Sequence, residues 1–525
     1  MVGEEFIKVL KSCRRSLLGS YTGKAKRRGS SMSKFSFSNV PRLQLLSRDE
    51  VESIHLASTK LLEDVGVKIY NDTALRLLAD AGAEVDSNNK LARIPQHLVK
   101  ESLVKAPSTI RLYSRDGKHD RVLERNKVTY NPGSAALFIL DSKTNETRRP
   151  LSRDLADLVR LTDALEYVQA QSTALVVSDV PVGIVDRYRL FVVLKNSPKP
   201  IVTGTFSVDG LYDMKRMLEA VVGGEKELAR KPMAVFDTCP SAPLKWSELL
   251  SQNLIDCAKF RIPAEIVPMP QLGATGPATL AGSLVQHNAE FLSGLVMAQL
   301  TNPGAPVIYG GSPTTFDQRY ATARLGAIET IMLGCSYAQI GKYYGLPTHM
   351  YLGLSDTKVV DAQCGFESGI GIVLGALAGI NVMSGPGMLN FESCQSLEKL
   401  VIDNTICGMA LRLVKGVRVD DETLAADLLR KVGPGGMYLA EKHTLQWFRK
   451  EQFMPSEIID RREWKAWKAA GSKDIVQRAK VIVEKTLKEH KPEPLPHDIE
   501  NDLEDVVRDI MKQHKISTLP LVSAS

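Results

Sequence analysis

The sequence lacks several patterns that would place it in a common class of protein. No run of 18 or more apolar residues is free of polar interruption, so no transmembrane helix and no membrane partner are predicted. The seven cysteines are scattered and form no C-x-x-C pair, which argues against a disulfide framework or a metal site and favours a reducing, cytoplasmic location. No G-x-G-x-x-G motif follows the first predicted strand, so the dinucleotide-binding fingerprint is absent.

Positive charge is scarce outside the N-terminus. The net charge is +7, but residues 1–31 hold eight basic and two acidic residues and therefore carry +6 of it. The remaining chain is nearly neutral and shows no basic stripe, so no nucleic-acid partner is predicted. We expect residues 1–35 to be a disordered basic extension, with Met32 as a natural start. The extension has no long apolar segment typical of a secretory signal, although its composition also suits a mitochondrial leader.

Beyond this extension, the hydrophobic pattern divides the chain into three parts. Residues 36–125 are predicted to form an α-rich segment with short strands, because apolar residues recur there at helical spacing between glycine turns. Residues 126–415 alternate short apolar runs with longer helical patterns. Residues 416–525 are helical in pattern, charged and rich in tryptophan, and are predicted to form a C-terminal helical segment.

Residues 126–415 contain eight apolar runs that we predict to be strands. Strands that alternate with helices pair in parallel, and eight such units favour an α/β fold, a closed (β/α)₈ TIM barrel, over an open doubly wound sheet. The predicted strands are 127–131, 168–177, 200–206, 233–238, 264–269, 306–310, 347–352 and 380–384. The predicted helices between them include 184–195, 209–221, 246–260, 279–301, 319–344 and 357–378.

The segment after the seventh predicted strand is unusually rich in polar groups. In a parallel barrel the active site lies at the C-terminal ends of the strands, and "PTHMYLGLSDTKVVDAQCGFESG" occupies such an end at residues 347–369. His349 and Tyr351 project to the same face of the strand, so both face the barrel interior if either does. His349 is equally well explained as a satisfied core histidine.

The helix predicted next to this strand carries a polar stripe on a mostly apolar surface. Ser355 or Asp356 is expected to cap it, and Asp356, Gln363 and Glu367 fall on one side. Because a helix apolar on most sides is buried, Gln363 and Glu367 need partners or face a polar pocket. A structural hydrogen-bond network and a functional site both satisfy this requirement.

Aromatic residues follow several of the predicted strands. Most are explained by packing, but a few around one pocket would form a cage that attracts a quaternary ammonium ion through cation–π interactions. These residues are Tyr130, Phe206, Phe236, Tyr309, Phe316 and Phe391.

Long collinear segments of the chain resemble the trimethylamine methyltransferase family, the MttB-like corrinoid-dependent methyltransferases. They include "VPMPQLGATGPATLAGSLVQHNAEF", "GLSDTKVVDAQCGFESG", "LVIDNTICGMALRLVKGV" and "VGPGGMYLAEKHTLQWFRKEQF". The resemblance covers about residues 44–490. It implies a (β/α)₈ barrel that demethylates a methylated amine and passes the methyl group to the Co(I) of a separate, cognate corrinoid protein, and it implies a homo-oligomer.

One departure from the family narrows the implied substrate. The trimethylamine enzymes of the family carry pyrrolysine near this strand, whereas the region around 349–353 here holds only standard residues. The resemblance is therefore to the non-pyrrolysine branch, which acts on small quaternary amines such as glycine betaine, whose leaving group is already a neutral tertiary amine. The chain also lacks the D-x-H-x-x-G pattern of corrinoid-binding domains, so the corrinoid (cobalamin) is expected on the partner, with no cofactor bound by this chain alone.

These considerations give a predicted site and two alternatives. His349 and Glu367 are the predicted catalytic residues. The predicted substrate-binding residues are Tyr309, Phe316, Tyr351, Asp356 and Gln363. The first alternative is a barrel that binds betaine without catalysis, and the second is a Schiff-base lyase that uses Lys358.

Overall fold

The computed structural model describes residues 41–133, 135–454 and 456–520. They form two compact units, of which the larger comprises Val40–Gly416 and Met437–Ser525 and the smaller contains Val417–Gly436. The predicted disordered extension, residues 1–35, lies outside the described residues. No helix within the described ranges is both long and apolar enough to cross a membrane.

Eight parallel strands close into a barrel in the larger unit. They are β6 (Thr129–Asn131), β9 (Gln171–Ser172), β10 (Ile201–Thr203), β11 (Ala234–Thr238), β13 (Ala264–Ile266), β15 (Val307–Tyr309), β18 (His349–Met350) and β19 (Val382–Ser384). Five pair in the order β15-β13-β11-β10-β9 and three in the order β18-β19-β6. The two groups join through a parallel bridge between Tyr309 and Thr348, and through hydrogen bonds from the Gln169 and Ala170 amides to the Tyr130 carbonyl.

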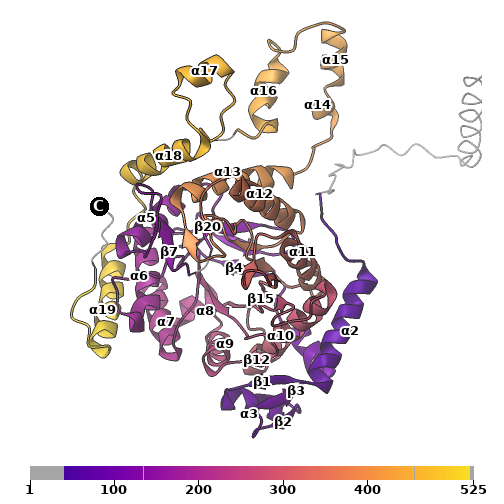
Figure 1. Cartoon of the computed structure of the whole chain (residues 1–525), viewed down its shortest axis with the longest axis vertical. Coiled ribbons are helices and arrows are strands. Elements are labelled where there is room, and N and C mark those ends of the chain that lie inside the picture. Colours follow the sequence, from indigo (N-terminus) through magenta and orange to yellow (C-terminus); the bar gives the residue numbers. More distant parts are fainter. Residues whose placement is uncertain (1–40, 134, 455, 521–525) are drawn as a thin grey trace, which may run out of the picture. The chain divides into compact units, whose positions relative to one another are not determined.

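A helix follows every barrel strand, and these helices surround the strands in Figure 1. They are α5 (Ser152–Ala164), α6 (Val185–Asn196), α7 (Val208–Val222), α9 (Glu248–Phe260), α10 (Leu280–Thr301), α11 (Ile328–Tyr343), α12 (Ala362–Leu377) and α13 (Leu397–Leu413). The strands are buried on both faces, which explains their continuous β-branched runs such as Ile201-Val202-Thr203. The predicted (β/α)₈ barrel is confirmed, and each predicted strand contains one barrel strand.

Short elements decorate the loops of the barrel. They are β7 (Phe138–Leu140), β8 (Thr147–Arg148), η1 (Val182–Ile184), α8 (Glu225–Arg230), β12 (Lys245–Trp246), β14 (Gln271–Leu272), β16 (Thr314–Asp317), β17 (Thr322–Arg324), β20 (Met388–Leu389) and β21 (Cys394–Gln395). The β16–β17 hairpin makes the predicted start of one helix wrong, because Thr315 pairs with Arg324 and Asp317 with Thr322 where the helix 319–344 was expected to begin. That helix, α11, starts only at Ile328.

The predicted cap of the helix after β18 is also wrong. The helix α12 starts at Ala362 rather than near residue 357, and Asp361 caps it by accepting a hydrogen bond from the Cys364 amide. Ser355 and Asp356 cannot serve as caps because their side chains are engaged elsewhere, in contacts with Glu367 and with the Leu325 amide.

Additional elements flank the barrel at both ends of the chain. Before it come α2 (Arg48–Asp64), β1 (Val67–Ile69), α3 (Asp72–Asp80), β2 (Glu84–Asp86), β3 (Leu91–Arg93), α4 (Gln96–Lys105), β4 (Ile110–Leu112) and β5 (Arg121–Leu123). After it come α16 (Lys442–Glu451), α17 (Trp464–Ala469), α18 (Ile475–Glu489) and α19 (His497–Gln513). The smaller unit holds α14 (Asp421–Leu424) and α15 (Ala426–Val432).

Candidate active site at the C-terminal end of the barrel

A cavity of about 410 Å³ lies where the barrel strands end. It is lined by residues of β10, β11 and β19, by residues of the loops that follow β6, β9, β10, β11, β13, β18 and β19, and by one residue of α6 and two of α9. Its lining includes Gly133, Thr173, Arg189, Val202, Thr205, Phe206, Asp237, Cys239, Leu249, Leu250, Met269, Tyr351, Ser384 and Glu392. The cavity therefore occupies the place where parallel barrels hold their active sites, and its size suits a small molecule.

Three carboxyl groups meet at this cavity. Asp237 and Glu392 line its wall, and the fully buried Glu265 is the direct neighbour of Asp237 in the pairing of β11 with β13. Burial raises the pKa of Glu265 to about 8 and that of Glu392 to about 8. Burial, and next the charge of Glu265, raise the pKa of Asp237 well above its usual value. The cavity thus holds acids that a bound cation would ionise.

His349 and Tyr351 belong to the same polar cluster. The His349 Nδ1 lies 2.8 Å from Glu265 Oε1, and its Nε2 lies 3.0 Å from the Ser384 hydroxyl. Burial lowers the pKa of His349 to about 4, so the imidazole is neutral at pH 7. Tyr351 donates a 3.3 Å hydrogen bond to Asp237 and lies edge-on to the His349 ring at 4.7 Å. Tyr351 lines the cavity, whereas His349 stands behind it.

An unusual loop conformation brings Glu392 to the cavity. Asn390, Phe391 and Glu392 all have left-handed backbone conformations, with φ angles of 50°, 56° and 66°. Residues other than glycine adopt this region at a cost, and such conformations concentrate at functional sites. The loop therefore holds a carboxyl group in place at the expense of backbone strain.

The other polar residues predicted after β18 form a separate cluster that ties α12 to a loop. Glu367 accepts hydrogen bonds from the Ser355 hydroxyl at 2.5 Å, the Asp356 amide at 2.9 Å and the Gln363 side chain at 2.9 Å. Asp356 accepts from the Leu325 amide at 3.0 Å, and burial raises its pKa to about 6. Glu367, Asp356 and Gln363 are not among the residues that line the cavity.

Two predicted aromatic residues also lie elsewhere. Tyr309 points to the barrel helices, where its hydroxyl donates to Asn288 at 2.8 Å and its ring packs on Phe291 of α10 at 4.1 Å. Phe316 lies in the β16–β17 hairpin opposite Ala323. Neither belongs to the cavity lining, so of the predicted site residues only Tyr351 contacts the cavity directly.

Lys358, the candidate Schiff-base lysine, is exposed. Its ammonium donates to the Asp356 carbonyl at 2.8 Å and lies 4.1 Å from the centre of the Phe391 ring. A Schiff-base lysine needs a desolvated amine that is free to attack a carbonyl. This position offers neither condition.

The sequence interpretation missed four residues of the cavity cluster: Asp237, Glu265, Glu392 and Arg189. Glu265 carried the clearest signal, since it is an acid inside the otherwise apolar run "AEIVPM". Asp237 is likewise an acid inside a predicted apolar strand, 233–238. Glu392 and Arg189 gave no such signal, because acids in loops and arginines on helices are common and mostly exposed.

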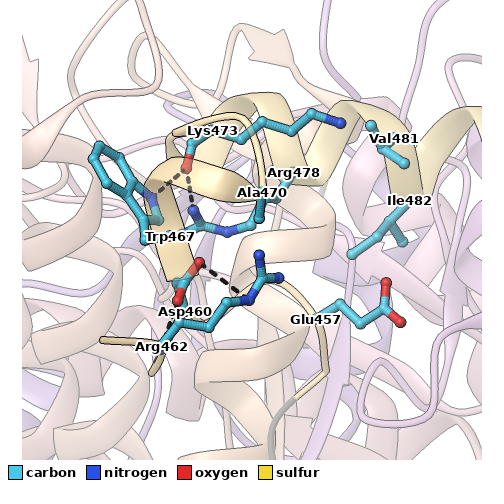
Figure 2. Close-up of a pocket in the computed structure, with 9 residues that line it drawn as sticks. All are labelled: Glu457, Asp460, Arg462, Trp467, Ala470, Lys473, Arg478, Val481 and Ile482. Atoms are coloured by element: carbon cyan, nitrogen blue, oxygen red, sulfur yellow. Dashed lines mark hydrogen bonds and ion pairs between the residues drawn. The ribbon is translucent and has the colours of Figure 1, made fainter. Parts of the chain in front are cut away.

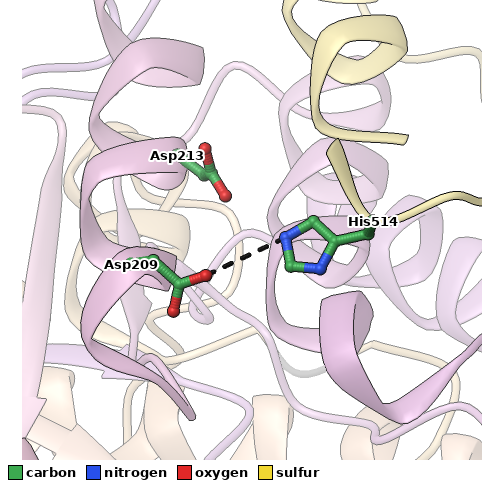
Figure 3. Close-up of side chains that lie close together, drawn as sticks. All are labelled: Asp209, Asp213 and His514. Atoms are coloured by element: carbon green, nitrogen blue, oxygen red, sulfur yellow. Dashed lines mark ion pairs between the residues drawn. The ribbon is translucent and has the colours of Figure 1, made fainter. Parts of the chain in front are cut away.

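Two further candidate sites consist of side chains that already bind one another or the backbone. A pocket of about 150 Å³ near α17 and α18, shown in Figure 2, contains Trp467 and Arg478, which both donate to the Lys473 carbonyl. Figure 3 shows Asp209, Asp213 and His514, whose ligand atoms lie within 4.8 Å of one another. Arg187 pairs with Asp209 at 3.0 Å and with Asp213 at 3.1 Å, so a cation already neutralises these carboxylates.

Most of the chain is similar to proteins of one known family. The model of a family described as trimethylamine methyltransferase (MTTB) matches residues 18–514. The chain is 34% identical over 471 residues to the trimethylamine methyltransferase MttB of Desulfitobacterium hafniense, covering 90% of this chain and 95% of the relative. It is 35% identical over 480 residues to the MttB of Methanosarcina barkeri, covering 90% and 96%.

A glycine betaine methyltransferase and a solved structure are also similar to this chain. The glycine betaine methyltransferase of Desulfitobacterium hafniense is 30% identical over 467 residues, which cover 89% of this chain and 96% of the relative. The crystal structure of the monomethylamine methyltransferase MtmB of Methanosarcina barkeri superposes with a TM-score of 0.50 at 11% identity, covering 91% of this chain and 90% of that chain. The last similarity concerns the fold alone.

Proposed function

Because this chain belongs to the trimethylamine methyltransferase family, we propose that it removes a methyl group from a small quaternary amine of the glycine betaine type and transfers it to the Co(I) of a corrinoid on a separate protein. The observation that carries the proposal is the cluster of buried carboxyl groups beside Tyr351 in the cavity at the strand ends. The similarity to a glycine betaine methyltransferase supports a quaternary amine as the substrate.

In this proposal the cavity wall holds the positive nitrogen. Asp237 and Glu392 would lose their protons to the bulk when a permanent cation enters, because the ion pair favours their charged forms. The ring of Tyr351 adds a face that attracts a quaternary ammonium. Glu265 and the neutral His349 would stand behind Asp237 and fix its position, which makes His349 a positioning residue rather than one that touches substrate.

The apolar part of the wall would align the substrate and exclude water. Val202, Leu249 and Leu250 line the cavity. Such apolar side chains can pack against the methyl groups of the substrate and offer no hydrogen bond that would hold water. A neutral tertiary amine leaves when the C–N bond breaks, so the chain has no proton to deliver, and none of its acids needs to act as a general acid.

The corrinoid would supply the cobalt nucleophile that accepts the methyl group. A cavity of about 410 Å³ suits a small amine, and the lining residues Phe206 and Met269 remain partly exposed, so the cavity is reachable from outside. These residues fit a corrinoid presented at the cavity mouth by another protein. Large apolar side chains are exposed on elements that follow barrel strands and offer a docking surface to that protein: Val182, Phe206, Val208, Met269, Phe366 and Ile370.

The test combines the full chain with a purified corrinoid protein in its Co(I) state and methyl-labelled glycine betaine. We expect label on the corrinoid protein and one dimethylglycine per methyl group transferred, only when all three components are present. We expect Asp237→Asn to lower kcat/KM by about 30-fold or more, because a desolvated charge pair is lost. Equal methylation of free cobalamin would contradict a dedicated partner, and no label transfer from any quaternary amine would contradict the proposed reaction.

A further inference from the structure

One cation in the cavity wall is not held in an ion pair by any acid among the described residues. Arg189, on α6, lines the cavity, and only 2% of its surface is exposed. Its Nη2 donates to the Thr173 carbonyl, whereas its Nε is buried without a hydrogen-bond partner among the described residues. In the part of the chain that the structure describes, no carboxylate oxygen forms an ion pair with it. Its guanidinium lies 5.1 Å from the centre of the Phe206 ring.

The neighbouring arginine of the same helix shows what a buried guanidinium normally requires. Arg187 is equally buried and pairs with Asp186, Asp209 and Asp213 at 3.0–3.1 Å. Asp186 cannot serve Arg189 as well, because its second oxygen accepts from the Phe206 amide and the Thr205 hydroxyl. Asp186 is therefore committed elsewhere. Asp237, the other acid whose charge acts on Arg189, forms no ion pair with it.

A buried guanidinium without a counter-ion is costly for the folded protein. Burial lowers the pKa of Arg189 to about 10, which leaves the group charged at neutral pH. An isolated buried charge is rare unless a ligand or an ion pair compensates it. Since Arg189 contacts the cavity, an anionic group of a ligand is the natural partner, and a guanidinium binds a carboxylate well in two-pronged geometry.

The other polar groups of the cavity divide the wall by charge. Asp237 and Glu392 supply an acidic region, which a bound cation would ionise, and Arg189 supplies a positive one. His349, which the sequence suggested as a carboxylate donor, is not among the lining residues, and its Nε2 is hydrogen-bonded to Ser384. A ligand that satisfies both regions carries both a positive and a negative charge.

We propose that Arg189 is the carboxylate receptor of this cavity, and that it makes the enzyme specific for zwitterionic quaternary amines over cations of similar size without an acid group. This inference rests on the proposed function and adds the residue that distinguishes among its substrates. Phe206 stacks on the guanidinium and would hold its plane toward the cavity.

Calorimetric titration of the full chain tests this without any methyl transfer. Glycine betaine serves as the zwitterion, and choline, with a hydroxyl group in place of the carboxylate, serves as the matched cation. We expect the wild type to bind glycine betaine at least about 30-fold more tightly than choline, and Arg189→Met to abolish this difference by weakening betaine binding. Choline binding should change less than about threefold.

Two further variants separate recognition from a structural role. Arg189→Lys keeps the charge but loses the planar fork, so we expect intermediate betaine affinity. Arg216→Met on α7, a partly exposed arginine paired with Asp509 and outside the cavity lining, should leave both affinities unchanged. We expect Arg189→Met without ligand to melt at the same temperature as the wild type or higher, because it removes an uncompensated charge.

The outcomes distinguish the two proposals. Betaine binding that depends on Arg189 but leads to no methyl transfer would reject the proposed reaction and support the receptor. Equal binding of choline and betaine by the wild type, or equal loss of both in Arg189→Met, would overturn the receptor and leave the reaction intact. Failure of the wild type to bind either compound would overturn the receptor as well.

Discussion

A carboxyl group inside a barrel avoids the cost of burial by keeping its proton. Glu265 does so behind Asp237, beside the His349 imidazole, and both side chains are therefore uncharged at pH 7. That state changes when a permanent cation arrives, since the cation stabilises the ionised form. The residues of this cluster therefore link protonation both to folding and to binding.

The first prediction concerns stability. The pKa of Glu265 is about 8 in the folded protein against about 4.5 for an unburied glutamate, so between these pH values the folded state retains a proton that the unfolded state has released. Stability contributed by this group is complete below pH 4.5 and falls as the pH rises to 8, by up to about 1.4 kcal/mol per pH unit. Glu265→Gln should therefore stabilise the protein more at pH 8 than at pH 5 in thermal melts. The exposed Glu484→Gln on α18 is the control, and a Glu265→Gln effect that does not vary with pH would contradict the linkage.

The second prediction concerns binding. A quaternary ammonium should lower the pKa of Glu392, which lines the cavity, from about 8 and should also lower the raised pKa of Asp237. Glycine betaine should therefore bind more tightly as the pH rises from 6 to 8 and should release protons when it binds. Titrations at pH 7 in two buffers of different ionisation enthalpy measure this release. It should disappear above about pH 9, where the acids are already ionised. Identical heats in both buffers would mean that these carboxyl groups do not face the cation.

At the scale of elements, the sequence predicted the strands better than the side-chain hydrogen bonds that connect helices and loops. The β-branched runs located all eight barrel strands, because burial on both faces leaves a continuous apolar signature. The start of α12 was not predictable from local spacing, since Ser355 and Asp356 look like caps but are held by Glu367 and by the Leu325 amide. Such contacts depend on how the elements meet in space.

The third prediction tests the tie between α12 and its loop. Glu367 accepts three hydrogen bonds there and lies outside the cavity lining, so Glu367→Gln should lower the free energy of unfolding by about 1–3 kcal/mol. Methyl transfer per folded molecule should change less than about threefold. Denaturant titration and kinetics measure the two effects, with Gln363→Ala as a milder variant that removes one of the three bonds. A variant with unchanged stability and a loss of kcat of about 100-fold would instead make Glu367 catalytic.

At the scale of the whole molecule, the candidate site combines residues that the sequence keeps far apart. Arg189 and Asp237 come from one half of the barrel, whereas Tyr351 and Glu392 come from the other. The barrel rule pointed to the end of the barrel at which this cavity lies. It could not select these residues, because whether a side chain points into the cavity or to the helices, as Tyr309 does, depends on the closed barrel.

The fourth prediction concerns the C-terminal helix α19, which packs on α7. Its apolar face holds Leu503, Val507 and Ile510 buried, and ion pairs such as Lys195–Glu504 surround it. Leu503→Ala should lower the free energy of unfolding by about 2–4 kcal/mol, because it removes a fully buried side chain and leaves a void. Leu445→Ala on α16, where the side chain is largely exposed, should have little effect in the same denaturant titration. Equal effects would mean that α19 is not part of the folded core.

The two junctions that close the barrel contain fewer backbone contacts than the pairs of strands within each group, and this should affect how fast the barrel opens locally. Within the described residues, one strand group joins the other through the Tyr309–Thr348 bridge on one side. On the other side they join through the Tyr130 carbonyl and, beyond the strands, through the Ala136–Leu175 bridge. Local unfolding should begin at these two junctions. The amides of Tyr309 and Gln169 should therefore exchange hydrogen for deuterium faster than the amides of the central strand β11. A betaine that contacts Arg189 in one strand group and Tyr351 and Glu392 in the other would link the two groups and stabilise both junctions. Saturating glycine betaine should therefore slow hydrogen exchange at the two junctions by about tenfold and leave exchange in α19 unchanged. Junction amides that exchange at the same rate with and without glycine betaine would show that the ligand contacts only one strand group.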